Sequence, residues 1–155
     1  MAMITLDFKI DEAAFATDGR YSPATASQAA LEETYFLTPF RFCVDGVELL
    51  GVHGRQPATL GLPLLGFASH VHQVVAATRP GKRKRCYLAG GGDLTFERRA
   101  NLMHVSSSLT GAAVTVDAGE LLQAVRSLLE NVRNLLLKRF PDMQAHPAWG
   151  SWFST

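Results

Sequence analysis

The stretch AAVTVDAGELLQAVRSLLENVRNLLLKRF, residues 112–140, carries the two signals that decide the fold. Its beginning alternates apolar and polar residues as a strand does, and the rest repeats leucine and valine every three or four residues, which is the spacing of one helical face. Asp117 is a suitable helix N-cap, and Glu120 three residues later completes the reciprocal capping pattern. We therefore predict a strand over 112–117 that leads directly into a helix over 118–139.

Several short strand signals lie upstream of these two elements. Asp45-Gly46 separates two apolar segments and supplies the positive φ angles that a tight hairpin turn requires. Residues 3–10 alternate apolar and polar side chains, which predicts a half-buried strand. The remaining strand candidates are residues 84–89, 94–99 and 101–107. Short turns join these candidates to one another and to the strand before the long helix, so we expect an antiparallel meander.

A second helix is predicted over residues 62–79, because apolar residues again follow the three-to-four spacing and a Pro-Gly pair ends the pattern. Residues 17–31 contain many small and polar residues and predict a long loop, with a helical turn after Pro23. Packing both helices on a sheet buries both apolar stripes at once. The expected fold is α+β, with a mostly antiparallel sheet and two main helices packed on one face, in a single domain over 1–155.

The composition narrows the class of protein. Of 155 residues, 47% are hydrophobic, and 15 Lys and Arg side chains nearly balance 14 Asp and Glu side chains. Such a chain has enough apolar residues for a folded core, and it has too little positive charge for a dedicated DNA-coating protein. The N-terminal segment lacks the basic start of a secretory signal, and the longest uncharged stretch, residues 56–78, contains prolines and histidines that a bilayer core disfavours. We expect a cytoplasmic protein with no membrane partner.

The residue types that carry chemistry form no recognised motif. His70 and His72 are about 200° apart around a helix, which places them badly for sharing one metal ion. Cys43 and Cys86 lie within apolar strand patterns, where cysteine usually packs as a small hydrophobe, and two cysteines supply neither a disulfide framework nor a zinc quartet. We therefore predict no catalytic residue, no metal and no cofactor, and we favour a protein that is not an enzyme.

The five histidines leave one alternative open. A pocket between helix and sheet that uses His70, His72 or His104 would make the protein a small-molecule binder or a small enzyme. The helical spacing of the apolar residues instead favours histidines that lie at the boundary of the core and act neither as ligands nor as general bases. His53 and His146 have no candidate partner in the sequence, and we interpret them as structural.

A basic cluster is the best functional hint in the middle of the chain. Four consecutive cations follow the second helix, and two more stand at the end of a neighbouring strand candidate. A solvated loop is the plain interpretation, and a positive patch for an acidic protein surface or for nucleic acid is the functional one. We expect nucleic acid less, because few aromatic residues accompany the charge. The binding residues that this pattern predicts are Lys82, Arg83, Lys84, Arg85, Arg98 and Arg99.

An aromatic tail, residues 141–155, contains Trp149, Trp152 and Phe153 close to its end. Aromatic residues at this density either lock onto the domain or bind something outside it. Leu137 points away from the apolar stripe of the long helix, so a tail that folds back would cover it. We favour this packed tail and keep Trp149 and Trp152 as binding candidates under the alternative.

Residues 94–153 resemble a class of small bacterial proteins, some of which are immunity proteins against polymorphic toxins. The resemblance is carried by LTFERRANLMHVSSS and by VDAGELLQAVRSLLENVRNLLLKRFPDMQAHPAWGSWF. It brings no catalytic motif with it and implies a protein that binds and inhibits a toxin. The predicted function is therefore a non-catalytic protein-binding domain with immunity-like inhibition as its specific role. A protein partner is expected, and a homodimer is compatible with this function.

Overall fold

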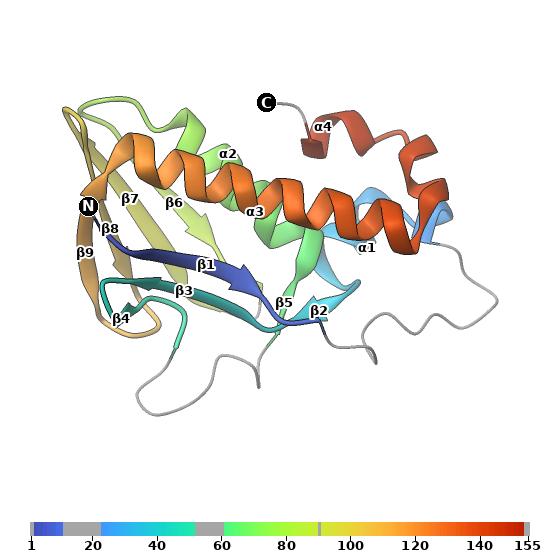
Figure 1. Ribbon diagram of the computed structural model, residues 1–155, viewed down its shortest axis with the longest axis horizontal. Coiled ribbons are helices and arrows are strands. Elements are labelled where there is room, and N and C mark those ends of the chain that lie inside the picture. The colour runs from blue at the N-terminus through green and yellow to red at the C-terminus, as the bar shows by residue number, and fades with distance from the viewer. Residues whose placement is uncertain (1, 11–22, 52–60, 90, 154–155) are drawn as a thin grey trace.

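A computed structural model describes residues 2–10, 23–51, 61–89 and 91–153 of the protein (Figure 1). The strands are β1 (Ile4–Phe8), β2 (Leu37–Thr38), β3 (Phe40–Val44), β4 (Val47–Glu48), β5 (Leu62–Pro63), β6 (Arg83–Tyr87), β7 (Asp93–Arg99), β8 (Leu102–Ser107) and β9 (Ala113–Asp117). The helices are α1 (Gln28–Glu33), α2 (Leu64–Ala77), α3 (Ala118–Arg139) and α4 (Trp149–Phe153), with 3-10 turns at Pro23–Thr25 and Pro141–Ala145. No helix within these ranges is both long and apolar enough to span a bilayer.

The largest sheet is an antiparallel meander of β6, β7, β8 and β9 in that order. Helices α2 and α3 contact each other and the inner face of this sheet (Figure 1). Six side chains of that face are at most 3% exposed: Cys86, Leu94, Phe96, Met103, Val105 and Val116. The α+β class, the mostly antiparallel pairing and the two main helices are confirmed.

The strands form three sheets and not the single sheet that the sequence suggests. Strands β1, β3 and β4 make a separate antiparallel sheet, and β2 pairs with β5. The β3–β4 hairpin has the predicted turn, with φ of 49° at Asp45 and 83° at Gly46. After β4 the chain turns towards the core, and Leu49 is fully buried there. The Ser107 hydroxyl at the end of β8 donates to the Leu49 carbonyl, just after β4, at 2.6 Å, so a side-chain hydrogen bond connects the two sheets.

Helix α3 has the predicted bounds, because its start and its buried face are both encoded locally. The Asp117 carboxylate accepts a hydrogen bond from the Glu120 backbone N–H at 3.0 Å and caps the first turn. The buried residues of α3 are Ala118, Leu121, Val125, Leu128, Leu129, Val132 and Leu136. The helix contacts β1, β8 and β9, so its apolar face closes the core over two of the sheets.

Helix α1 is a helix that the sequence analysis missed, because residues 17–31 were expected to form a loop. Strand β5 was also missed, because its residues were expected to begin the helix over 62–79. The turn after Pro23 is present, but α1 follows it, and the Ser27 hydroxyl caps this helix by accepting from the Ala30 N–H at 3.1 Å. Residues 17–22 lie outside the described ranges. Leu31 is fully buried and ties α1 to the core.

Candidate partner-binding site at strand β6

Strand β6 is an edge of the four-stranded sheet, because β7 is its only hydrogen-bonded neighbour among the described strands. Just beyond the strand, the Leu88 N–H donates to the Gly92 carbonyl at 3.0 Å on the side of β7. Backbone groups alternate in direction along an antiparallel ladder. The N–H and C=O groups of Arg83, Arg85 and Tyr87 therefore point away from β7, towards the open edge.

The basic run, Lys82–Arg85, lies along this edge, with all four side chains exposed. The sequence analysis placed Lys82 and Arg83 in a loop before the strand, whereas the structure begins β6 at Arg83. Strand pairing with β7 orders the run, since Arg83 is in register with Glu97 and Arg85 with Thr95. Arg83, Lys84 and Arg85 are thus held on a strand, and Lys82 directly precedes it.

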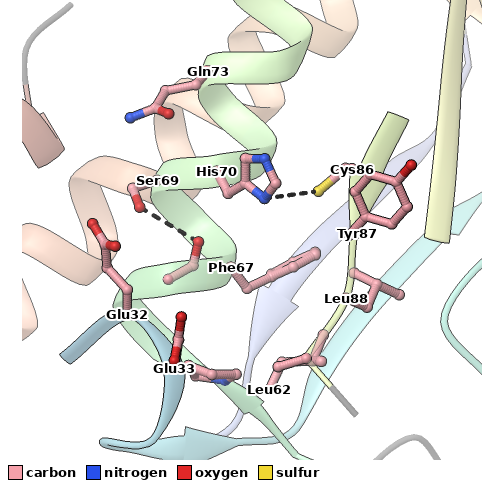
Figure 2. Close-up of a pocket in the computed structure, with 13 residues that line it drawn as sticks. Glu32, Glu33, Leu62, Phe67, Ser69, His70, Gln73, Cys86, Tyr87 and Leu88 are labelled. Atoms are coloured by element: carbon pink, nitrogen blue, oxygen red, sulfur yellow. Dashed lines mark hydrogen bonds between the residues drawn. The ribbon is translucent and has the colours of Figure 1, made fainter. Parts of the chain in front are cut away.

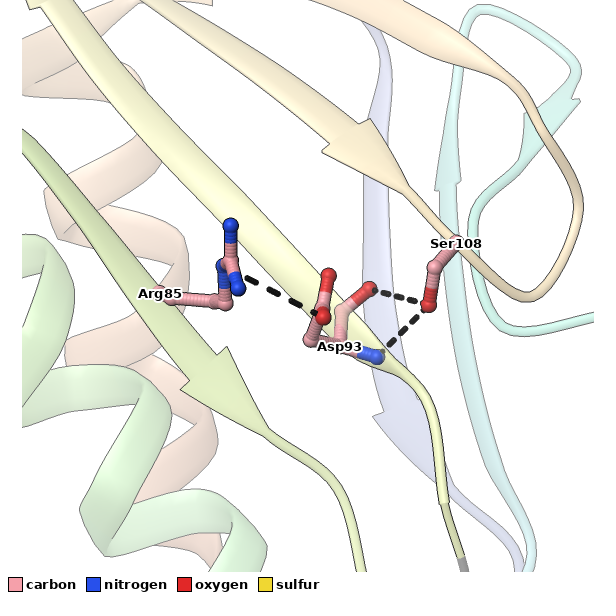
Figure 3. Close-up of polar contacts among 3 residues, drawn as sticks. All are labelled: Arg85, Asp93 and Ser108. Atoms are coloured by element: carbon pink, nitrogen blue, oxygen red, sulfur yellow. Dashed lines mark hydrogen bonds and ion pairs between the residues drawn. The ribbon is translucent and has the colours of Figure 1, made fainter.

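Arg85 is the best-anchored cation of the run. Its Nε lies 4.0 Å from Oδ2 of Asp93 (Figure 3). Its guanidinium carbon lies 5.9 Å from the centre of the Tyr87 ring. Ser108 fixes Asp93, because its hydroxyl accepts from the Asp93 N–H at 2.8 Å and contacts the Asp93 carbonyl at 3.3 Å (Figure 3). An exposed ion pair of this length contributes about 0–1 kcal/mol. Arg85 therefore keeps most of its capacity to bind an external anion.

Arg98 and Arg99 do not extend the run as one patch, because neighbouring residues of a strand face opposite sides of the sheet. Arg98 donates from Nε to the Ala100 carbonyl at 3.0 Å and supports the β7–β8 turn. Arg99 pairs with the Glu97 carboxylate at 3.0 Å. Glu97 is the register partner of Arg83, but its Oε1 is already bound by Arg99. Within the described ranges, no carboxylate lies at ion-pair distance from Lys82, Arg83 or Lys84.

A groove of about 590 Å³ runs between α2 and β6 and is closed at one end by α1 (Figure 2). This β6 groove is lined by apolar and polar side chains, including Glu32, Phe67, His70, Gln73, Cys86 and Leu88. The α1 wall was absent from the sequence analysis. Its sequence signal is a serine N-cap followed by the helix-forming residues QAALEE.

Cys86 and His70 meet at the floor of the groove, with Sγ 3.7 Å from Nδ1 (Figure 2). Burial raises the pKa of the Cys86 thiol to about 12, and the residue is fully buried. The thiol is therefore protonated near neutral pH and contacts the imidazole. A nucleophilic cysteine needs the thiolate, so this pair is arranged for packing and not for covalent catalysis.

The three histidines of the alternative hypothesis do not share a pocket. His70 lines the β6 groove, whereas His104 lies on the outer face of the sheet, in a shallow depression with its Nδ1 3.0 Å from the Thr115 hydroxyl. His72 is only 5% exposed, so the expectation of a boundary position is wrong for it. Its burial follows from the packing of α2 against both β6 and α3. His53 lies outside the described residues.

The buried position of His72 predicts a pH dependence of stability. Burial, and then the nearby charge of Arg126, lower the pKa of His72 below its ordinary value of 6.5. The unfolded chain therefore takes up this proton first as the pH falls. The contribution of His72 to the free energy of unfolding is complete above a pH of about 6.5 and is lost progressively below it.

Urea unfolding of the wild type and of His72→Asn at pH 7.5 and pH 5.5 measures this contribution. We expect the wild type to lose more stability than the variant between the two pH values. An equal loss in both proteins would show that His72 is not the group responsible.

The aromatic tail packs onto the domain. Trp149 and Trp152 are 8% and 2% exposed, and Leu137 is half-buried and packs against the hydrophobic core. The two tryptophans are therefore part of the core. The alternative prediction that they form an exposed binding patch is wrong. His146 also has partners that the sequence did not reveal: its Nε2–H donates to the Ala26 carbonyl at 2.8 Å, and its Nδ1 accepts from the Ala148 N–H at 3.0 Å.

Metal-ligating side chains do not gather in the part of the chain that the structure describes, where no group of three His, Cys, Asp or Glu residues is placed to hold an ion. Comparisons of the chain with protein-family models, with curated proteins and with solved structures return no match. The residues that the structure does bring together are the basic run, Tyr87 and the wall of the β6 groove.

Proposed function

We propose that this protein is a non-catalytic protein-binding domain that recognises an acidic surface of a partner through the basic run on β6. The observation that carries the proposal is a run of four consecutive exposed cations, three of which lie on an open edge strand and the first of which directly precedes it. The whole chain has a net charge of only +1, so this concentration of positive charge is local. Charge of one sign on a surface steers the approach of a partner with the opposite sign.

A protein partner fits this surface better than nucleic acid does. The whole chain has a net charge of only +1, whereas proteins that coat nucleic acid are strongly basic. Single-stranded nucleic acid also requires aromatic rings for base stacking. Tyr87 is exposed beside the run, but Phe96 on the neighbouring strand is fully buried.

The specific role that we propose is inhibition of a bacterial toxin, in the manner of an immunity protein. The resemblance of residues 94–153 to such proteins supports this role, and an inhibitor of this kind needs a binding surface and no catalytic groups. The proposed compartment is the cytoplasm. Cys43 and Cys86 are free and buried, which suits a reducing environment.

The test begins with native mass spectrometry of the protein purified gently from the cells that produce it. We expect a stoichiometric protein chain with an acidic surface to accompany it. Arg83→Glu should then weaken the complex about tenfold or more, because a like charge at an interface is repulsive. Lys138→Glu provides the matched control, since Lys138 is an exposed cation at the far end of α3 and should leave the affinity unchanged.

Salt provides the second readout, since an electrostatic interface weakens as ionic strength rises. Equal affinity of the wild type and Arg83→Glu, with no response to salt, would contradict the proposal. A stoichiometric small molecule in place of a protein chain would favour the pocket hypothesis instead.

A further inference from the structure

We propose that the partner contributes an extended, acidic segment that pairs with β6 as a fifth strand of the four-stranded sheet. This inference rests on the proposed function and specifies how the partner binds. Strand addition to an exposed edge is a common mode of peptide recognition, in which backbone hydrogen bonds give affinity and alternate side chains give specificity.

The backbone of β6 is available for such pairing. Arg83, Arg85 and Tyr87 direct their N–H and C=O groups to the open side, and none of these groups has another backbone partner among the described residues. None of the three is a proline, so each supplies both a donor and an acceptor. A strand at the usual spacing of about 4.8 Å would meet all of these groups in one register.

The side chains around β6 define what the added strand must carry. Residues directly opposite one another in a ladder point to the same face of the sheet. Residues of the added strand opposite Arg83 and Arg85 would share the outer face with these cations, which selects Asp or Glu. Residues opposite Lys84 and Cys86 would point to the inner face, where the β6 groove offers the apolar wall of Phe67. The expected segment therefore alternates acidic and apolar residues.

The basic run also favours an acidic segment over a second copy of the chain as the strand that pairs with β6. Antiparallel pairing of β6 with the β6 strand of another copy would set cations against cations, and like charges directly opposite are destabilising. Positive charge on an edge strand is a known device against self-association. The other edge of the sheet, β9, has the sequence AVTVD and no cation, so it does not select an acidic strand.

The test uses the full chain and a defined probe, the acetylated and amidated peptide Glu-Val-Glu-Val-Glu-Val-Glu, at low salt. Two isomeric probes carry backbone N-methyl groups either on the inner glutamates or on the valines. Only one of these two sets of N–H groups faces β6 in a paired strand: the glutamate set in antiparallel pairing and the valine set in parallel pairing. A Lys-Val peptide of the same length is the charge control.

We expect saturable binding of the acidic peptide with a Kd of about 1 mM or tighter, and a loss of about tenfold or more for one methylated isomer only. Amide hydrogen exchange of the protein should slow at Arg83, Arg85 and Tyr87 when the peptide binds. Arg83→Glu should weaken the binding, and Lys138→Glu should not.

The possible failures distinguish the two proposals. Equal binding of both methylated isomers, without slower exchange at those amides, would overturn strand addition while leaving recognition of acidic surfaces intact. Equal binding of the acidic and the Lys-Val peptides, or no binding of either, would overturn strand addition. The effect of Arg83→Glu on the affinity for the copurified partner is a separate measurement, and it decides the proposed function.

Discussion

Trp152→Ala is expected to lower the free energy of unfolding by about 3–5 kcal/mol, the usual range for removing a large buried aromatic side chain. The indole is 2% exposed, and its ring centre lies 4.9 Å from that of His146. Its Nε1–H donates to Oε1 of Glu32 in α1 at 2.8 Å. The substitution therefore leaves a cavity and removes the hydrogen bond that ties the tail to α1. Urea unfolding at pH 7.5 measures the loss.

Trp152→Phe is the matched control for this experiment. It retains a buried six-membered ring but removes the five-membered part of the indole with its N–H, so a smaller loss of about 1–2 kcal/mol is expected. Because Glu32 also lines the β6 groove, hydrogen exchange in α1 should accelerate in the alanine variant more than in the phenylalanine variant. Unfolding of the alanine variant at the same urea concentration as the wild type would contradict the packed tail.

Local signals were enough to predict the elements that need no distant partner. Helix α3 combines an N-cap at Asp117 with an uninterrupted apolar stripe, and the β3–β4 turn follows from the φ preferences of Asp45-Gly46. Both features depend only on residues that are close together in the sequence. The predicted helix and the predicted turn therefore agree closely with the structure.

Helix α1 could not be predicted in the same way, because its stability comes from distant residues. It has only six residues, which is too short for an isolated helix to be stable in water. Its carboxylate at Glu32 accepts a hydrogen bond from Trp152, and its backbone packs against Gly66 of α2. Neither contact leaves a periodic signal in the segment itself.

The candidate site was predictable in its residue types but not in its arrangement. The charge of Lys82–Arg85 is evident in the sequence, whereas its place on an edge depends on the order of strands in the sheet. The period-two geometry of a strand already implies that Arg98 and Arg99 face opposite sides. The burial of His72 required knowledge of both neighbours of α2, because two sides of that helix are covered.

Gly66→Ala is expected to destabilise the protein by about 3 kcal/mol, at the upper end of the range for overpacking. A Cβ built on Gly66 would lie 1.9 Å from the backbone oxygen of Glu32. A backbone atom cannot rotate out of the way as a flexible side chain can, so α1 must move away from α2. Because α1 closes one end of the β6 groove, this movement would also reshape the groove.

Gly150→Ala in α4 separates this clash from the general effect of replacing a helical glycine. A Cβ at Gly150 meets no atom within 4 Å, so this variant should be as stable as the wild type or more stable by about 0.5–1 kcal/mol. Urea unfolding midpoints of the two variants measure the difference between them. Equal midpoints would mean that α1 does not pack on α2. In contrast, a large loss at Gly66 alone would establish that the close approach of these two helices forms the end wall of the groove.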